Sequence, residues 1–479
     1  MTTEKYFALR HPEFRKRADS KIREKDETDY EEVIAVVPYK EDKFPHEEDY
    51  NRRVPAEADE SIKYDHSITH HLFGERVPDI VLDLVEISVI TFAADKAADR
   101  GIQIDNEDLD ESRLNTRNIK LQIPVLSPKM ATEEMEQLYS EMVSHMTRDI
   151  IEYDFQLVDK QESVEVSTNQ SEFDAVCLLS DGLDSTAGIY HNLRQETDSE
   201  HVTVNYGSGA GSKAKEIADQ ADVSSRIFRT QYNDKGESTQ FSRGLLHLSF
   251  AAVAASAHGT EEIRCFENGI MAQFLILSEG WMTTRTVSPL FLTYFNKILD
   301  NALPQPIEVK NPFVNLTKTE IINKIPSTEL VQKTLSCPHK SWFGHNNCGL
   351  CMPCLIRNIG IIRSDHEIPL EVLSRYDPLL SADFEDQSFE VDGNENLNNS
   401  ANTPSIFFKG ITEIAYFCRR ILEDDPRDLA TEHPELLNKP IYEQHRQFAE
   451  NFTEALELIS EQNSTIQTLI TGQQHKLPQ

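Results

Sequence analysis

The chain has 479 residues, with 47 Lys and Arg against 81 Asp and Glu and a net charge of −34. This length is enough for about three domains, and the acidity disfavours nucleic acid as the main partner because it repels phosphate backbones. The first residues lack the apolar core of a signal peptide and no later segment approaches about 18 uncharged apolar residues, so we expect a cytoplasmic protein with no membrane partner.

The first 75 residues are dense in charged side chains and contain one apolar run, Val33–Pro38, that predicts a strand. We therefore expect residues 1–75 to form a charged N-terminal arm. The pattern then changes, and residues 76–160 predict an α+β domain in which no catalytic motif is evident. Its predicted elements are a helix at 80–98, a strand at 119–125, a helix at 131–147 and a strand at 150–157.

A polar stretch at 159–172 precedes a segment in which short apolar runs alternate with helical patterns. The run Ala175–Leu179 is wholly apolar, as expected for a central parallel strand that is covered on both faces. The alternation predicts a doubly wound α/β domain with a parallel sheet over residues 173–370. The other predicted strands are 202–206, 226–231 and 263–266. Three helices are predicted: one that ends near residue 193, one that begins near residue 212, and one over 239–257.

The connection between the first strand of this domain and its helix contains Ser180, Gly182 and Ser185. A glycine turn that leads into a helix N-terminus directs several backbone N–H groups to one point, and the hydroxyl groups can add hydrogen bonds, so this loop predicts an anion site. A turn that binds nothing is the alternative. The residues expected to form the site are Leu179, Ser180, Asp181, Gly182, Leu183, Asp184, Ser185 and Thr186.

Four cysteines lie within 18 residues in the spacing Cys-x10-Cys-x2-Cys-x2-Cys, as Cys337, Cys348, Cys351 and Cys354. Overlapping Cys-x2-Cys pairs can place adjacent thiolates around one tetrahedral ion, and the ten-residue loop can return the fourth, so the cluster predicts a structural Zn²⁺ site. An iron–sulfur cluster is the alternative, and a group of metal-free buried thiols is a weaker one. His339 and His345 lie in the loop and could replace one thiolate.

Residues 383–403 are rich in Asp, Asn, Glu and Ser and predict a linker. A helical segment is expected at 404–470, with a break near 426–440, and we expect it to pack on the core or on a partner. The remaining cysteines lie in apolar runs and are expected to be buried: Cys177, Cys265 and Cys418.

The loop resembles the Ser-Gly-Gly-x-Asp-Ser loop of the ATP pyrophosphatase (PP-loop) superfamily, and the matching residues are Ser180, Gly182, Asp184 and Ser185. Members of that superfamily transfer AMP to an oxygen atom of their substrate and release pyrophosphate. The resemblance therefore implies ATP, with Mg²⁺ bridging its phosphates. Asp181 departs from the superfamily, which usually has Gly there, and a carboxylate in that place weakens nucleotide binding unless it faces away or holds Mg²⁺.

The same resemblance bears on a glycine-rich stretch that begins at Gly207, because the end of the second strand lies close to the adenine in the superfamily. It implies that Tyr206 and Gly207 line that pocket, and a flexible turn is the alternative. A nicotinamide dinucleotide site is not expected here, since the fingerprint for that cofactor needs a glycine where the chain has Ser212.

The loop and the cysteine cluster together resemble the 7-cyano-7-deazaguanine synthase family, QueC, over about residues 175–362. Further matching segments are Tyr206-Gly207, Arg243, Leu316-Thr317-Lys318, Cys348-Gly349 and Cys354 to Arg357. The residues for which the resemblance implies a catalytic role are Asp184, Ser185, Arg243 and Lys318. For Arg243 the alternative is a residue that starts a helix, and for Lys318 it is a part of the capping turn of Thr317 and Glu320.

The chain is much longer than an ordinary synthase and is similar to the extended QueC-like proteins of anti-phage defence, such as the QatC component of the Qat system. This resemblance implies an ATP-dependent ligase that activates 7-carboxy-7-deazaguanine or a similar acid and couples it to an amine, including the N-terminus of a partner protein from a defence operon. The alternatives are an ordinary 7-cyano-7-deazaguanine synthase and a non-catalytic scaffold subunit. Transfer of sulfur to tRNA is disfavoured by the net charge of −34.

Overall fold

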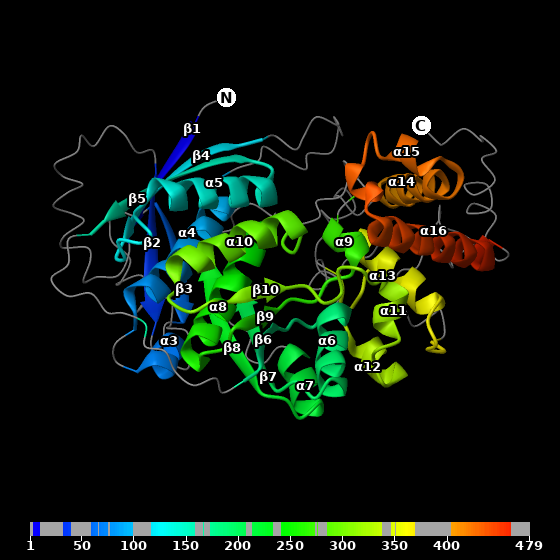
Figure 1. The fold of residues 1–479 in the computed structure, drawn as a ribbon, viewed down its shortest axis with the longest axis horizontal. Helices are drawn as coiled ribbons and strands as arrows, with labels where there is room; N and C mark the ends of the chain where they lie inside the picture. The colour runs from blue at the N-terminus through cyan, green and yellow to red at the C-terminus, as the bar shows by residue number, and fades with distance from the viewer. Residues whose placement is uncertain are drawn as a thin grey trace.

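The computed structural model describes residues 3–9, 32–39, 59–65, 67–74, 77–98, 116–158, 166, 173–206, 213–232, 241–273, 275, 285–337, 346–349, 351–368 and 404–460. The strands of this part of the chain are β1 (Thr3–Leu9), β2 (Glu32–Tyr39), β3 (Glu60–Asp65), β4 (Asn118–Val125), β5 (Ile150–Leu157), β6 (Ala175–Leu178), β7 (Ser199–Tyr206), β8 (Ser225–Tyr232), β9 (Glu262–Arg264) and β10 (Glu308–Lys310). They form one sheet in the order β10-β9-β6-β7-β8-β3-β2-β1-β4-β5 (Figure 1).

Helices cover this sheet and extend beyond one end of it (Figure 1). In the first half of the chain they are α3 (Ser67–Phe73), α4 (Asp79–Ala97) and α5 (Glu133–Thr147). In the second half they are α6 (Leu183–Arg194), α7 (Lys213–Gln220), α8 (Arg243–His258), α9 (Gly269–Gln273), α10 (Pro289–Ala302), α11 (Lys318–Ile322), α12 (Thr328–Lys333) and α13 (Met352–Ile362). The C-terminal ones are α14 (Pro404–Glu423), α15 (Pro426–Leu429), the 3₁₀ helix η5 (Pro434–Leu437) and α16 (Lys439–Ser460).

The sheet consists of two five-stranded parallel halves that meet at a single antiparallel pair. In that pair, β3 and β8 place Ile62 opposite Tyr232 and Tyr64 opposite Thr230. When the strands of each half are numbered along the chain, both halves have the order 3-2-1-4-5, read outward from the junction. The helices agree with this repeat, because α4 packs on α8 after the third strands and α5 packs on α10 after the fourth strands. The two halves are therefore related by an approximate two-fold axis.

The N-terminal half is thus an α/β unit, and the prediction of an α+β domain at 76–160 is wrong. Strands β1, β2 and β3 also lie within the region 1–75 that the sequence suggests is a charged arm. The charges explain the error: parallel strands covered on both faces are usually continuous apolar runs, whereas β1 contains Glu4 and Lys5 and β3 contains Lys63.

Other expectations about the elements are confirmed. The predicted strand at Val33–Pro38 is β2, the elements expected at 80–157 are α4, β4, α5 and β5, and the C-terminal helices break between α14 and α16. The strand expected at 263–266 is shorter and ends at Arg264. The linker at 383–403 lies outside the described residues, as does nearly all of 159–172.

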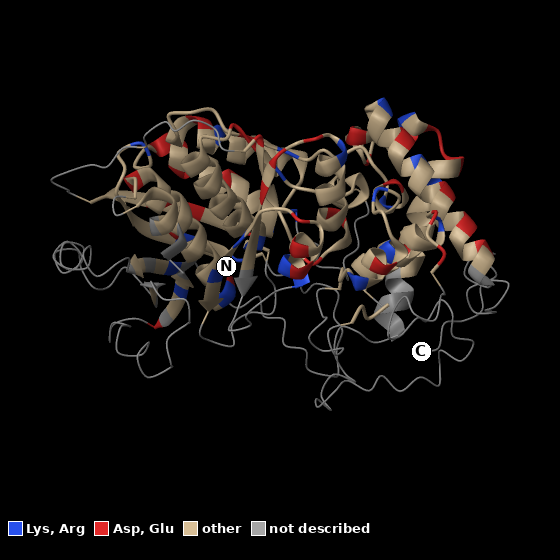
Figure 2. Cartoon of the chain, turned by 90° about the horizontal axis from the view of Figure 1, so that it is seen from below, with Lys and Arg blue, Asp and Glu red and all other residues tan. Residues whose placement is uncertain are grey.

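The C-terminal helices pack on the core. Helix α14 lies along α16, and α16 contacts α9 and α13 (Figure 1). In the view of Figure 2, the acidic residues of the described part of the chain are spread over the sheet units and these helices. Among the described residues, no helix combines the length and the apolar character that a membrane span requires.

A buried ion cluster joins the two halves of the sheet. Arg117, just before β4, donates from Nη2 to Asp95 at 2.6 Å and to Asp149 at 2.7 Å. The second carboxylate oxygen of Asp95 accepts from the backbone N of Ser242 at 2.9 Å and from its hydroxyl at 2.7 Å. Because Asp95 lies in the last turn of α4 and Ser242 is the N-cap of α8, the cluster fixes how these equivalent helices meet.

Replacing Arg117 by Met leaves the carboxylates of Asp95 and Asp149 buried without their cation. We expect the free energy of unfolding to fall by about 3–5 kcal/mol, the cost of breaking a buried pair. Urea denaturation measures this loss. The matched control is Arg446→Met, which breaks an exposed pair with Glu450 and should cost less than about 1 kcal/mol. Similar small losses in both variants would show that the buried cluster does not hold the halves together.

Candidate functional site

The loop at Ser180–Thr186 lies where the strand order reverses. From β6 the chain passes to β7 and β8 on one side and then returns to β9 and β10 on the other side. In open parallel sheets, ligands bind outside the carboxyl ends of the strands at such a point. The fold therefore brings this loop, which follows β6, next to the segment that follows β9.

Two serine hydroxyl groups hold the loop in shape. Ser185 Oγ donates to the carbonyl oxygen of Ser180 at 2.9 Å and accepts from its backbone N at 3.1 Å. The hydroxyl of Ser180 lies 2.9 Å from that of Ser185 and accepts from the backbone N of Gly182 at 3.1 Å. The backbone of the loop is thus fixed before any ligand binds.

Gly182 is the N-cap of α6, so no cap side chain accepts from the N–H groups of the first helical turn. A Cβ atom at this position would lie 2.9 Å from Ser180 Oγ, so a larger residue would displace the hydroxyl group. A helix N-terminus with its N–H groups available, flanked by serine hydroxyls, suits a phosphate group. The neighbouring Asp181 is half-buried, and its carbonyl oxygen accepts from the backbone N of Leu335 at 2.7 Å.

Asp184 is buried in the first turn of α6 and binds two residues from other segments. Its Oδ1 accepts from Lys318 Nζ at 2.6 Å, and its Oδ2 accepts from the backbone N and the side-chain Nδ2 of Asn268, each at 3.0 Å. Burial alone would raise the pKa of Asp184, but Lys318 and the hydrogen bonds outweigh it and lower the pKa to about 2. The structure thus joins two of the four residues with an expected catalytic role in one ion pair.

Glu267 is a further member of this cluster that the sequence does not reveal. It follows β9, and its carboxyl group hydrogen-bonds to Asp184 and accepts from Asn268 Nδ2 at 2.7 Å. Burial and the nearby Asp184 carboxylate raise the pKa of Glu267 well above its ordinary value. Of these two neighbouring carboxyl groups, Glu267 is therefore the one that takes up a proton more readily. In the sequence, its only signal is an acidic residue directly after the apolar pair Cys265-Phe266.

Glu267 makes stability depend on pH. Because its folded pKa lies above the unfolded value of 4.5, the stabilisation is complete below pH 4.5 and is lost as the pH rises through the folded pKa. Glu267→Gln keeps the neutral form at every pH, so the stability of the wild type relative to this variant should fall by up to about 1.4 kcal/mol per pH unit above pH 5. Denaturation curves from pH 5 to 9 measure the difference. The exposed control Glu308→Gln should not change the slope, and parallel curves for wild type and Glu267→Gln would contradict the assignment.

The other expected site residues lie elsewhere along the carboxyl edge. Arg243 is exposed at the first position of α8, after β8, and it is not among the groups that bind Asp184 in the described part of the chain. With about 4.8 Å between strands, the ends of β8 and β6 are about 10 Å apart. Tyr206 ends β7, next to β6, and Gly207 lies outside the described residues.

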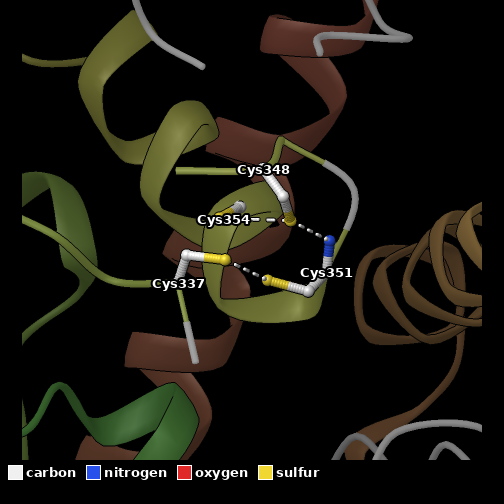
Figure 3. Close-up of side chains that lie close together, drawn as sticks. All are labelled: Cys337, Cys348, Cys351 and Cys354. Carbon is white, nitrogen blue, oxygen red and sulfur yellow. Dashed lines mark hydrogen bonds between the residues drawn. The ribbon is translucent and has the colours of Figure 1, made fainter. Parts of the chain in front are cut away.

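The four clustered cysteines lie together, as expected from their spacing (Figure 3). Their sulfur atoms are all within 4.8 Å of one another, with 3.8 Å between Cys348 and Cys354 and 3.9 Å between Cys337 and Cys351. A tetrahedral Zn²⁺ site with Zn–S bonds of about 2.3 Å has sulfur–sulfur distances of about 3.8 Å. The cluster therefore has the donors and the spacing for zinc. The predicted burial of Cys177, Cys265 and Cys418 is also confirmed.

Residues 241–364 match the family model described as QueC, queuosine biosynthesis protein QueC. This part of the chain is QueC-like. The match includes Lys318 and the four clustered cysteines, whereas the loop at Ser180–Thr186 precedes it and the C-terminal helices follow it. Since QueC proteins are ATP-dependent enzymes, the QueC-like domain indicates an ATP-using enzyme that acts on a small molecule.

Within the QueC-like domain, Arg357 lies on α13 one turn after Cys354 and is only 2% exposed. Burial lowers the pKa of Arg357 to about 10, so its guanidinium group is still charged at neutral pH. Burial also raises the pKa of the Cys351 and Cys354 thiols well above the ordinary value, and a bound cation would favour their thiolate forms. Zn²⁺ bound to four thiolates would have a charge of −2, and Arg357, which interacts electrostatically with Cys354, would partly offset it. His339 and His345 lie outside the described residues.

The cysteine cluster of the QueC-like domain is also tied to the loop after β6. The side chain of Asn347 accepts from the backbone N of Ser336 at 2.9 Å and donates to the carbonyl oxygen of Thr334 at 3.1 Å. Between these two residues lies Leu335, whose backbone N donates to Asp181. A metal that orders the cysteines would therefore also order residues 334–336, which contact the anion loop through Leu335 and Asp181.

Replacing Cys351 by Ser removes one sulfur from the cluster. We expect zinc to fall from about one ion per chain to a small fraction of that, with a lower thermal midpoint, because a structural zinc site contributes folding energy. Elemental analysis and thermal denaturation measure both effects. Cys418→Ala is the matched control, since Cys418 is buried near the cluster but is not one of its four members. If Cys351→Ser kept both its zinc and its thermal midpoint, the metal centre would lie elsewhere.

Proposed function

We propose that this chain activates a carboxylic acid by transferring AMP to it from ATP, with release of pyrophosphate. The observation that carries the proposal is the buried ion pair of Asp184 with Lys318, 2.6 Å long, beside a serine-lined helix N-terminus. The match of residues 241–364 to QueC, which includes Lys318, supports it. The acid that the QueC resemblance implies is 7-carboxy-7-deazaguanine.

The chemistry needs charge neutralisation more than proton transfer. A carboxylate oxygen of the acid attacks the α-phosphorus of ATP, one P–O bond forms, and the bond to the leaving pyrophosphate breaks. Negative charge grows on the leaving group, where the first-turn N–H groups of α6 would donate hydrogen bonds. The hydroxyls of Ser180 and Ser185 would keep the loop in the shape that presents these N–H groups. Lys318 would offset charge in the transition state, and Asp184 holds its ammonium group in place.

The carboxyl groups of Asp184 and Glu267 are the residues that would hold Mg²⁺, because hard cations prefer carboxylate oxygens. When bound, Mg²⁺ neutralises phosphate charge during the transfer. Because the pKa of Glu267 is raised, a cation at this pair would compete with a proton for its carboxyl group, and binding would be favoured as the pH rises.

A second step would attach an amine to the activated acid. Ammonia as the acceptor corresponds to an ordinary 7-cyano-7-deazaguanine synthase. We favour an amine of a partner protein in anti-phage defence, as the resemblance to QatC implies, because the N-terminal half of the sheet and the C-terminal helices lie outside the QueC match. We propose that three further residues bind the nucleotide or the acid. They are Arg243, which follows β8 in the chain, and Tyr206 and Gly207, at the end of β7.

A non-catalytic scaffold is the second candidate function. Asp181 favours it, because this carboxylate stands within the anion loop where the PP-loop superfamily usually has Gly. Pyrophosphate release from ATP and 7-carboxy-7-deazaguanine, with ammonia or a partner protein as the acceptor, separates the two functions. Zinc-loaded, folded protein that releases no pyrophosphate with any acceptor supports the scaffold.

Ser185→Ala removes a hydroxyl group whose hydrogen bonds to Ser180 hold the anion loop in shape. We expect ATP to bind about 10- to 100-fold more weakly, since the loop N–H groups lose their fixed positions and each hydrogen bond to a charged phosphate contributes about 1.5–3 kcal/mol. Calorimetry with ATP and Mg²⁺ measures the affinity. Thr293→Ala, which removes an exposed hydroxyl from α10, is the control and should bind ATP as the wild type does. Unchanged affinity in Ser185→Ala would place the nucleotide at another site.

A further inference from the structure

A glutamine of the C-terminal helix α16 reaches the segment that carries Lys318. Gln444 is 5% exposed, and its Nε2 donates to the carbonyl oxygens of Val314 at 3.1 Å and Leu316 at 2.9 Å. Both carbonyls belong to the connection between β10 and α11, which ends at Thr317, the N-cap of α11. One side chain from outside the QueC match therefore fixes the backbone directly before Lys318.

The same glutamine packs against the segment that holds Asp184. Gly269 donates from its backbone N to the carbonyl oxygen of Leu316 at 3.0 Å, and it directly follows Asn268, which binds Asp184. A Cβ atom on Gly269 would lie 2.0 Å from Gln444 Nε2 and 2.1 Å from the carbonyl oxygen of Val314. Gln444 thus lies where the segment before Lys318 meets the segment whose Asn268 binds Asp184.

Further contacts place α16 firmly against the QueC-like domain. Asn451 Nδ2 donates to the hydroxyl of Thr319 at 3.3 Å, and Arg363 of α13 forms an ion pair with Glu454. The aliphatic stem of Lys318 lies against Gly360 of α13, where a Cβ atom would come within 2.9 Å of Lys318 Cγ. Lys318 is therefore enclosed by α13 and by the backbone of residues 314–316, which Gln444 of α16 binds.

We propose that Gln444 is a positioning residue for Lys318, so that the C-terminal helices complete the ATP site. The effect of Gln444 on catalysis rests on the proposed function. Its effect on the position of Lys318 rests only on the contacts described above. The amide of Gln444 supplies a hydrogen-bond donor to both carbonyl oxygens, those of Val314 and Leu316. A carboxylate of the same shape would present only acceptor oxygens to them.

The first test uses Gln444→Glu and a matched control, Gln447→Glu, which lies one turn later on the exposed face of α16. Reductive methylation of the full-length zinc-loaded protein, read by mass spectrometry, reports how accessible Lys318 is. We expect Lys318 to react at least about tenfold faster in Gln444→Glu than in the wild type or in Gln447→Glu, with zinc content unchanged. An unchanged rate at Lys318 overturns the proposal, whether or not the protein uses ATP.

The second test separates positioning from general support of the fold. In a double-mutant cycle on pyrophosphate release, Gln444→Glu should slow the wild type at least about tenfold and should slow Lys318→Met no further, because its effect passes through Lys318. If the fold-reductions in the rate of pyrophosphate release multiplied in the double variant, Gln444 would act independently of Lys318. If the wild type releases no pyrophosphate, the proposed function fails, and the methylation rate alone decides the positioning.

Discussion

The buried ion pair of Asp184 and Lys318 is the interaction on which the rest of the site depends. Moving two charges out of water costs several kcal/mol for each ion unless good geometry and additional hydrogen bonds compensate. Asn268 donates two further hydrogen bonds to Asp184, and the capping box of Thr317 and Glu320 starts the helix that carries Lys318. Segments that follow β6, β9 and β10 must all be in place for this pair to form, so the strand order is itself a requirement of the site.

The cysteine cluster extends this requirement to the C-terminus. Its sulfur atoms share a hydrophobic core with α14 and α16, including Ile414 and Phe452. The C-terminal helices therefore pack on the core and share its hydrophobic interior. Removing them would uncover the cysteine cluster and the backbone before Lys318 at the same time.

The parts that could be predicted from the sequence depend on short-range patterns. The serine loop and the cysteine cluster lie within 7 and 18 consecutive residues, and the C-terminal break coincides with prolines. Glu267 and Gln444 could not be found in this way, because their partners are distant in the chain. Glu267 acts on Asp184 of another segment, and Gln444 binds carbonyl groups about 130 positions earlier. The N-terminal half was misjudged for a related reason: only the folded sheet shows that β1, with its Glu4 and Lys5, is covered by neighbours.

The antiparallel junction of the sheet has a consequence for biosynthesis. It pairs Ile62 with Tyr232, 170 positions later in the chain, while the other strands of the N-terminal half find their partners within residues 3–157. During translation the first half can assemble while the second is still being made, and β3 then presents an open edge until β8 leaves the ribosome. Such an edge is a template for pairing with the wrong chain. Lys63, in the middle of β3, places a charge at this edge, which is how natural sheets discourage association before the correct strand arrives.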